Sequence, residues 1–194
     1  MNSEFELFIR ICMAIIFFSS SISKYNTLDK HIGIIENYKV LPPSWSSVVG
    51  KLDVLVEFCL GILLLLGLFQ FLSGLIAGGL LLIYTMAIVI NIMRGRKEIS
   101  CGCGGVLGNH NLSWKLVIRN IILVSICILV SLNKELLFSI DAIIFRNKSL
   151  EVFGYKAWET IFVTLQAIII VLIAKEIINI RKLFKRIILS FKDL

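Results

Sequence analysis

Long apolar runs separated by short polar segments dominate the sequence. An α-helix needs about 20 mostly apolar residues to cross the core of a bilayer. Windows of this kind occur five times, at residues 7–23, 48–69, 71–93, 114–132 and 158–174. Only Gln70 separates the second window from the third, which predicts a tight hairpin of two helices. The pattern therefore predicts an all-α integral membrane protein with five spanning helices.

The spacing of the windows divides the chain into a core and an extension. We expect residues 1–132 to form a four-helix transmembrane bundle, with a polar loop at 94–113. Residues 133–194 are expected to hold a connecting segment, a fifth, C-terminal helix and a basic amphipathic tail, with a short amphipathic helix near 136–145. From residue 175 the tail mixes Ile, Leu and Phe with Lys and Arg at helical spacing. This spacing is typical both of a helix on anionic headgroups and of a solvated extension of the fifth helix.

The composition supports the membrane assignment. Hydrophobic residues make up 58% of the chain and the mean hydropathy is +0.92, whereas soluble chains hold about 45–50% apolar residues. The 20 Lys and Arg exceed the 13 Asp and Glu, which gives a net charge of +7. Most of these cations flank apolar runs, where they normally meet lipid headgroups, so no nucleic-acid partner is expected. Because the first run follows Glu4 and Glu6 instead of a basic segment, we expect it to be kept as a helix rather than cleaved.

Helices that alternate in direction bring alternate chain segments to one face of the membrane. At 1.5 Å per residue, Glu57 and Arg119 would lie roughly 14 and 8 Å below that face. Unpaired charges are costly at such depths. We therefore expect the two side chains to face the bundle interior and form an ion pair, either functional or a structural staple. The residues that this argument gathers toward one face are Lys24, Tyr25, Tyr38, Glu57, Asn91, Arg94, Cys101, Cys103, His110, Trp114, Arg119 and Asn120.

The strongest local signal is the Cys101-Gly102-Cys103 segment of the polar loop. Two thiols one residue apart close a disulfide ring only with backbone strain, and glycine supplies the freedom that this needs. Strained, exposed disulfides tend to be the labile, catalytic ones. Nearby basic residues would lower a thiol pKa and so raise the reactive thiolate fraction; they are Arg94, Arg96, Lys97 and His110. The pattern favours thiol–disulfide exchange.

Two other interpretations of this loop stay open. Cys101, Cys103, His110 and His31 offer four ligands to a metal ion, but the cysteines of zinc sites usually lie two to four residues apart, so metal binding is not favoured. The second alternative is a purely structural disulfide.

Further cysteines and glycines fall inside the predicted helices. Cys12, Cys59 and Cys127 are expected to act as small packing residues, although a ladder of thiols across the membrane is geometrically possible. Gly74 and Gly78 in the third helix are compatible with a dimerisation face, but such pairs more often let the helices of one bundle approach closely.

Several short motifs occur together in the first part of the chain. They are Lys24 at the end of the first helix, Tyr38…Leu41-Pro42, Glu57, Asn91-Ile-Met-Arg94-Gly95-Arg96-Lys97, Cys101-Gly-Cys103-Gly, Ser113-Trp114 and Arg119-Asn120. Together they resemble the methylamine-utilisation MauE family of DoxX-like membrane proteins, over about residues 1–132. One departure is Gly104, which stands where the family's usual Cys-x-Cys-Phe-Gly pattern has Phe.

The resemblance implies a membrane thiol–disulfide protein that works with a thioredoxin-like partner to form or maintain disulfides in exported proteins. Cys101 and Cys103 would be the catalytic pair, supported by Lys24, Glu57, Arg94, Arg96, Arg119 and Asn120. The resemblance implies no definite cofactor; a quinone, which other membrane disulfide systems use, stays open. The alternative function is a non-enzymatic membrane subunit or scaffold of a maturation or transport complex, in which the cysteine loop is structural or binds a metal.

The distribution of basic residues favours a different orientation of the chain depending on whether the fifth helix crosses the membrane. With five spans and the cysteine loop inside, the cytoplasmic segments hold twelve Lys and Arg against four, as the positive-inside rule prefers. If the fifth helix does not cross, a loop outside leaves ten inside against six, and the preference reverses. Disulfides persist in oxidising compartments. We therefore expect a multi-pass protein of the cell (inner) membrane with Cys101 and Cys103 on its extracytoplasmic face.

Overall fold

The computed structural model describes residues 3–108, 110–132, 137–146 and 154–192, and most of these residues are helical. No strand occurs within these ranges, where a single antiparallel backbone bridge joins Ser100 to Asn111. The elements are α1 (Ser3–Asn26), α2 (Leu28–Tyr38), α3 (Pro43–Leu66), α4 (Gln70–Met93), the 3-10 helix η1 (Gly105–Leu107), α5 (Trp114–Leu132), α6 (Ile140–Arg146) and α7 (Tyr155–Lys192).

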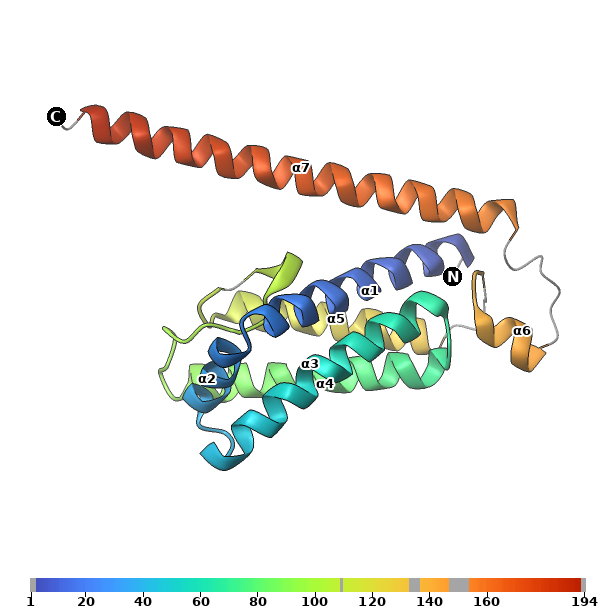
Figure 1. Ribbon diagram of the computed structural model, residues 1–194, viewed down its shortest axis with the longest axis horizontal. Helices are drawn as coiled ribbons and strands as arrows, with labels where there is room; N and C mark the ends of the chain where they lie inside the picture. The colour runs from blue at the N-terminus through green and yellow to red at the C-terminus, as the bar shows by residue number, and fades with distance from the viewer. Residues whose placement is uncertain (1–2, 109, 133–136, 147–153, 193–194) are drawn as a thin grey trace.

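Four helices, α1, α3, α4 and α5, form a bundle in which they run along one another (Figure 1). α1 packs on α3, and α4 packs on α5. The core between them is built from apolar side chains of all four helices, including Phe17, Leu60, Ala77, Leu81 and Cys127. α2 covers one end of the bundle, and α7 contacts α1 near its own start and then runs away from the bundle (Figure 1).

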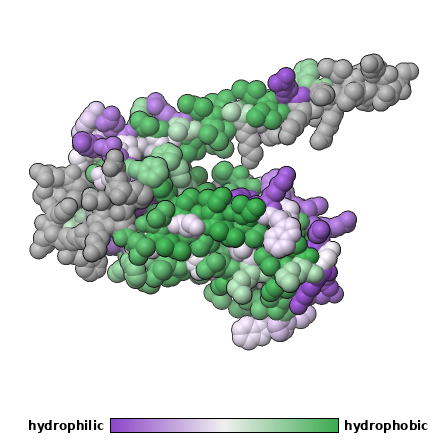
Figure 2. Space-filling view, turned by 180° about the vertical axis from the view of Figure 1, so that it is seen from behind, coloured by the Kyte–Doolittle hydropathy of each residue, from purple (hydrophilic) through white to green (hydrophobic). Residues whose placement is uncertain are grey.

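The surface of the bundle is that of a membrane protein. Figure 2 shows an apolar band along its length, with polar side chains gathered at one end. Among the described residues, four helices are long and apolar enough to cross a membrane: α1, α4, α5 and the Tyr155–Ile178 part of α7. Helix α3, the second of the five predicted spans, is not among them. The predicted all-α membrane bundle is therefore confirmed.

Helix α3 belongs to the bundle although Lys51, Asp53 and Glu57 interrupt its apolar sequence. Glu57 is only 2% exposed, so its charge faces inward. The opposite face carries large apolar side chains at helical spacing, as expected of a lipid-facing stripe; they are Val48, Leu52, Leu55, Phe58, Ile62 and Leu65. The carboxylates of Asp53 and Glu57 therefore face the interior of the bundle, whereas Lys51 is exposed.

The extension follows one of the two arrangements expected for the tail. The fifth apolar window and the basic tail form one continuous helix, α7, of 38 residues, so the tail extends the fifth helix. The short connecting helix is present as α6, which begins at Ile140. The first residues of the helix predicted near 136–145 lie partly outside the described residues.

A buried polar cluster fastens α6 to the end of the bundle opposite α2. Arg10 of α1 is 1% exposed, and its guanidinium donates to the carbonyl of Leu64 at 3.1 Å and to that of Phe138 at 2.6 Å. Asp141 of α6 accepts hydrogen bonds from the backbone N–H groups of Phe69 and Gln70, at 2.8 and 2.9 Å. Arg10 thus ties the last turn of α3 to the segment that precedes α6.

Gly74 allows α4 and α5 to approach closely. A Cβ atom at this position would lie 2.8 Å from the Cβ of Ser131 and 3.1 Å from the carbonyl oxygen of Cys127. The small residues of α4 therefore serve packing within the chain, which is the more common of the two roles expected from the sequence.

Candidate functional site

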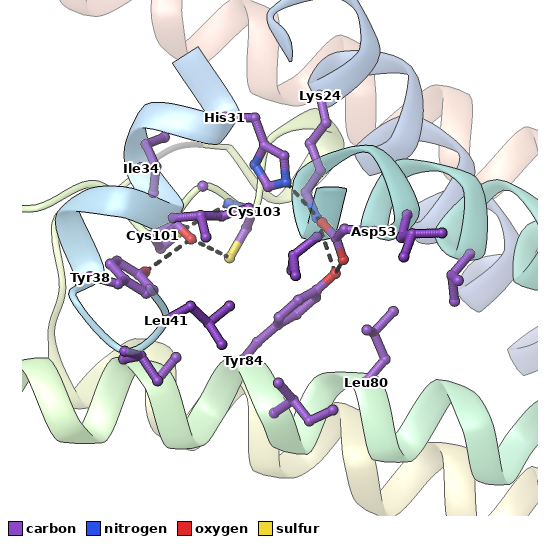
Figure 3. A pocket seen from close by; sticks show the side chains of 18 residues that line it. Lys24, His31, Ile34, Tyr38, Leu41, Asp53, Leu80, Tyr84, Cys101 and Cys103 are labelled. Carbon is purple, nitrogen blue, oxygen red and sulfur yellow. Dashed lines mark hydrogen bonds and ion pairs between the residues drawn. The ribbon is translucent and has the colours of Figure 1, made fainter. Parts of the chain in front are cut away.

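A cluster of ionisable side chains is buried where α1, α2, α3 and α4 meet. The Lys24 ammonium, on a residue 4% exposed, donates to Asp53 Oδ2 and to Glu57 Oε1, both at 2.8 Å. Tyr84 contributes its hydroxyl, which donates to Glu57 Oε1 at 3.0 Å and also contacts Asp53. His31 Nε2 lies 2.9 Å from Asp53 Oδ2. Figure 3 shows Lys24, His31, Asp53 and Tyr84 converging from four helices.

The composition of this cluster explains how carboxylates can lie inside the bundle. A single ammonium faces two carboxylates, and buried charges are tolerated only when they are paired and hydrogen-bonded. The Tyr84 hydroxyl and the His31 ring complete the pairing of Asp53, and the Lys24 ammonium also lies 4.7 Å from the centre of the Tyr84 ring. We name Lys24, His31, Asp53, Glu57 and Tyr84 the ion cluster.

The predicted ion pair between Glu57 and Arg119 is wrong. Glu57 binds Lys24, and the described residues show no ion pair between Glu57 and Arg119. Glu57 lies on α3, which packs on α1, whereas Arg119 lies on α5, which packs mainly on α4. Arg119 instead donates to Cys103 Sγ at 3.2 Å and to Asn120 Oδ1 at 3.3 Å.

The cysteine loop, at residues 94–113, forms a closed turn. It lies against the end of the bundle that holds the ion cluster. Cys101 N donates to the carbonyl of His110 at 2.9 Å, and Leu112 N donates to that of Ile99 at 3.0 Å, so the two arms of the loop pair. Gly102 has a φ of +67°, a conformation that favours glycine between the two thiols. The loop backbone thus holds the pair in a fixed place.

Three hydroxyl groups tie the cysteine loop to α1 and α2. Ser20 Oγ donates to the carbonyl of Cys103 at 2.7 Å, and Ser19 Oγ accepts from Val106 N at 3.2 Å. Tyr38 OH donates to the carbonyl of Cys101 at 3.2 Å. Burial raises the pKa of Tyr38, which keeps its hydroxyl a donor.

Glycine at position 104 is part of this docking. The residue has a φ of +58°, and a Cβ atom there would lie 2.8 Å from Ser23 Oγ of α1. The place that the resembled pattern gives to Phe is filled in this chain by α1 itself, so Gly104 lets the loop pack directly on the helix.

The two thiols are free and half-buried. A hydrogen bond from the Cys103 thiol lowers the pKa of Cys101 to about 5, against the opposing effect of burial and with help from backbone N–H groups and the Arg119 charge. The Cys103 amide donates to Cys101 Sγ at 3.3 Å. The same pairing raises the pKa of Cys103, which keeps its proton. The pair is therefore asymmetric: Cys101 is a thiolate at neutral pH and Cys103 a thiol.

The hydrogen bonds described for Arg94 and Arg96 go to backbone carbonyls and not to the thiols. Arg94 donates to the carbonyl of Lys39 at 3.2 Å, and Arg96 donates to that of Asn37 at 3.5 Å. The contacts described for these two residues fasten the end of α4 to the turn after α2. The cation that reaches the thiols is Arg119.

The described residues hold no group of three or more His, Cys, Asp or Glu side chains arranged to bind a metal ion. His31 belongs to the ion cluster, and His110 meets Cys101 through its backbone.

Sequence reasoning missed two members of the ion cluster, Asp53 and Tyr84. Asp53 carried a detectable signal, because it lies four residues before Glu57 and so shares its face of α3. Tyr84 carried none, since it lies in a window without charged residues.

Docking of the cysteine loop can be tested at Gly105. A Cβ atom there would lie 2.5 Å from the backbone of Ser19, at a φ of +56°. We expect Gly105→Ala to lift the loop from α1 and to raise amide hydrogen exchange of the loop about tenfold, which corresponds to ~1.4 kcal/mol of local opening. Gly95→Ala is the matched control, because φ is +75° there but nothing lies within 4 Å. Equal exchange in the two variants would contradict the docking.

The fold and the site define a membrane-embedded helical bundle with a dithiol loop docked over a buried ion cluster. The family model described as "Methylamine utilisation protein MauE" matches residues 2–133, and the chain belongs to this family. The membership of the MauE family that the sequence motifs predict is thereby confirmed.

Curated relatives agree with this assignment. The chain is 31% identical over 123 residues to "Methylamine utilization protein MauE" of Paracoccus denitrificans, a match that covers 63% of this chain and 66% of the relative. It is 31% identical over 97 residues to the protein of the same name from Methylophilus methylotrophus, covering 50% of this chain and 51% of the relative. The matches thus span about half to two thirds of the relatives' length. No solved structure matches the chain.

Proposed function

We propose that this protein is a membrane thiol–disulfide exchange protein that passes disulfides between Cys101/Cys103 and a thioredoxin-like partner, for the formation or maturation of disulfides in exported proteins. The observation that carries the proposal is the asymmetric thiol pair: Cys101 accepts hydrogen bonds at sulfur, and Cys103 lies 3.2 Å from the Arg119 guanidinium. A structural disulfide needs neither feature.

The asymmetry favours one direction of exchange. A thiolate that is stabilised in the reduced form makes the corresponding disulfide a stronger oxidant. The partner's thiolate then attacks Cys101 Sγ and breaks the Cys101–Cys103 bond. Cys103 departs as a thiolate beside Arg119 and takes up a proton. The partner's second thiol, as it loses its proton, attacks the mixed disulfide and releases Cys101, whose low pKa makes it a good leaving group. The partner gains a disulfide and the loop holds two reduced cysteines.

The proposed chemistry also determines the side of the membrane on which we place the cysteine loop. The loop lies on the extracytoplasmic face of the cell membrane, where exported proteins acquire disulfides. Impermeant maleimide should label Cys101 and Cys103 in intact cells only after mild reduction. Because the relatives are named for methylamine utilisation, we include exported proteins that serve this process among the final recipients.

The proposal is tested by trapping the mixed disulfide. The probe is a purified thioredoxin-like protein that keeps only its attacking cysteine, activated as a thionitrobenzoate disulfide. We expect Cys103→Ser to capture the probe at Cys101 and Cys101→Ser to capture at least tenfold less at neutral pH, because burial still raises the pKa of the Cys103 thiol when Cys101 is absent. Capture is read on non-reducing gels and by thionitrobenzoate release. Equal capture by both variants, or none by either, would contradict the proposal and favour a scaffold role.

A further inference from the structure

A cavity of about 370 Å³ lies between the cysteine loop and the ion cluster. Figure 3 shows Cys101 and Cys103 on one side of it, Tyr84 and Asp53 on the other, and His31 between them. Aliphatic side chains of α2, α3 and α4 make up the rest of its wall, among them Ile34, Val56 and Leu80. The volume lies in the range of about 300–1,000 Å³ that is usual for small-molecule pockets. An apolar wall with a few convergent polar groups is the usual composition of such a pocket.

The rim of the cavity belongs to the lipid-facing surface. Leu52 of α3 is 52% exposed and Ile83 of α4 is 63% exposed, and both line the cavity. Leu52 is part of the apolar stripe that α3 presents outward. Ile83 lies near the middle of α4, which is free of charged residues. A ligand can therefore reach the cavity sideways from the bilayer, which selects for a lipid-soluble molecule.

The inner end of the cavity has an unused hydrogen-bonding atom. His31 is 7% exposed, and its Nδ1 is buried without a hydrogen-bond partner, while Nε2 is occupied by Asp53. Buried polar atoms are normally paired. Nδ1 lies toward the cysteine loop, since a Cβ atom added to Gly102 would be 3.8 Å from it. A ligand hydroxyl in the cavity would donate to this atom, and a ligand carbonyl would accept from it when the ring carries a proton on both nitrogens.

We propose that the cavity binds a lipid-soluble quinone, which accepts the two electrons released when Cys101 and Cys103 form their disulfide. The inference rests on the proposed function, because a loop that oxidises its partner must be reoxidised by a two-electron acceptor. The cavity offers such an acceptor an entry from the membrane, contact with the thiol pair and an unpartnered histidine atom.

The reoxidation step balances. Forming the S–S bond from the Cys101 thiolate and the Cys103 thiol releases two electrons and one proton. Reduction of a quinone to a quinol takes up two electrons and two protons. The second proton reaches the ligand from Nδ1 of a doubly protonated His31, whose Nε2 contacts Asp53, and is replaced from water. In sum, a partner dithiol and a quinone become a partner disulfide and a quinol.

The test uses the purified full-length protein in lipid nanodiscs, a short-chain ubiquinone analogue as the probe and anaerobic conditions. We expect the reduced protein to lose two thiols per quinol formed, at a rate that saturates with quinone. Ala87→Trp fills the cavity and Ile83→Trp covers its rim, and each should slow the reaction at least tenfold. Ile76→Trp is the matched control, since Ile76 is an exposed residue of the same helix outside the cavity.

Binding is measured separately from redox chemistry in the Cys101→Ser/Cys103→Ser variant, through labelling by a photoreactive azidoquinone. Labels should fall on α2, α3 and α4 and be lost with Ala87→Trp. Oxidation that does not saturate, or labelling that Ala87→Trp leaves unchanged, overturns the inference even if the thioredoxin-like probe is captured. Saturable oxidation without capture of that probe supports the quinone site and removes the proposed partner.

Discussion

Lys24→Met should unfold the bundle or prevent its insertion. The substitution leaves Asp53 and Glu57 buried without a cation, and the contacts that remain, from Tyr84 and His31, supply hydrogen bonds but no fixed charge. Removing one partner of a buried ion pair costs about 3–5 kcal/mol. A loss of this size consumes much of the stability of a domain. We expect little monodisperse protein in size-exclusion chromatography, and thermal unfolding of the recovered fraction well below that of the native chain.

A compensated variant separates the charge effect from lost packing. Lys24→Met combined with Asp53→Asn and Glu57→Gln removes the buried negative charge, so most of the stability should return. Lys51→Met is the control for loss of a lysine, because Lys51 is exposed on α3 and its substitution should change stability by no more than about 0.5 kcal/mol. If the single Lys24 variant unfolds like the native protein, the ion cluster does not hold the bundle together.

The helices of this protein could be predicted because each long apolar run is visible in the order of residues along the chain. α4 and α5 coincide with their apolar windows to within a residue, since a long, mostly apolar run has few alternatives in a bilayer. The pairing of the charges could not be predicted in the same way. Counting residues along the helices places Glu57 and Arg119 at similar depths in the membrane. It does not show which helix packs against the face that carries each residue. That is settled by packing, and α3 packs on α1.

The buried polar cluster around Arg10 is a second feature that the sequence predicts only in part. Arg10 lies inside the first apolar window, where a charge normally counts against a span. Its ion pair with Glu6, at 3.8 Å, follows the i, i+4 spacing that the sequence displays, but its other partners are backbone carbonyls of residues far along the chain. Carbonyl partners leave no trace in side-chain identity. The cysteine loop is an intermediate case: the sequence identified both thiols, but only the folded loop distinguishes Cys101 from Cys103.

This distinction predicts an unusual pH profile of alkylation. With a pKa of about 5, Cys101 is almost fully a thiolate at pH 7, whereas a thiol of ordinary pKa near 8.5 has only about 3% thiolate there. Less basic thiolates are also weaker nucleophiles, by about 0.4–0.5 log units per pKa unit. The absolute rate at pH 7 is therefore a poor diagnostic. We expect a rate of reaction with iodoacetamide that is half-maximal near pH 5 and flat above about pH 7.

Unfolded protein and two variants test whether the low pKa of Cys101 is the cause of this profile. In unfolded protein the rate should rise about tenfold per pH unit until it approaches the ordinary thiol pKa. Cys103→Ala removes the thiol hydrogen bond, the largest favourable contribution to the low pKa of Cys101, but keeps the amide that donates to its sulfur. Its midpoint should therefore move upward, and that of Arg119→Gln should move upward by less. Mass spectrometry of the loop peptide follows the reaction. A native profile that still rises between pH 7 and 9, or a Cys103→Ala midpoint that stays near 5, would show that the thiol pair is not asymmetric, and the order of attack in the proposed exchange would lose its basis.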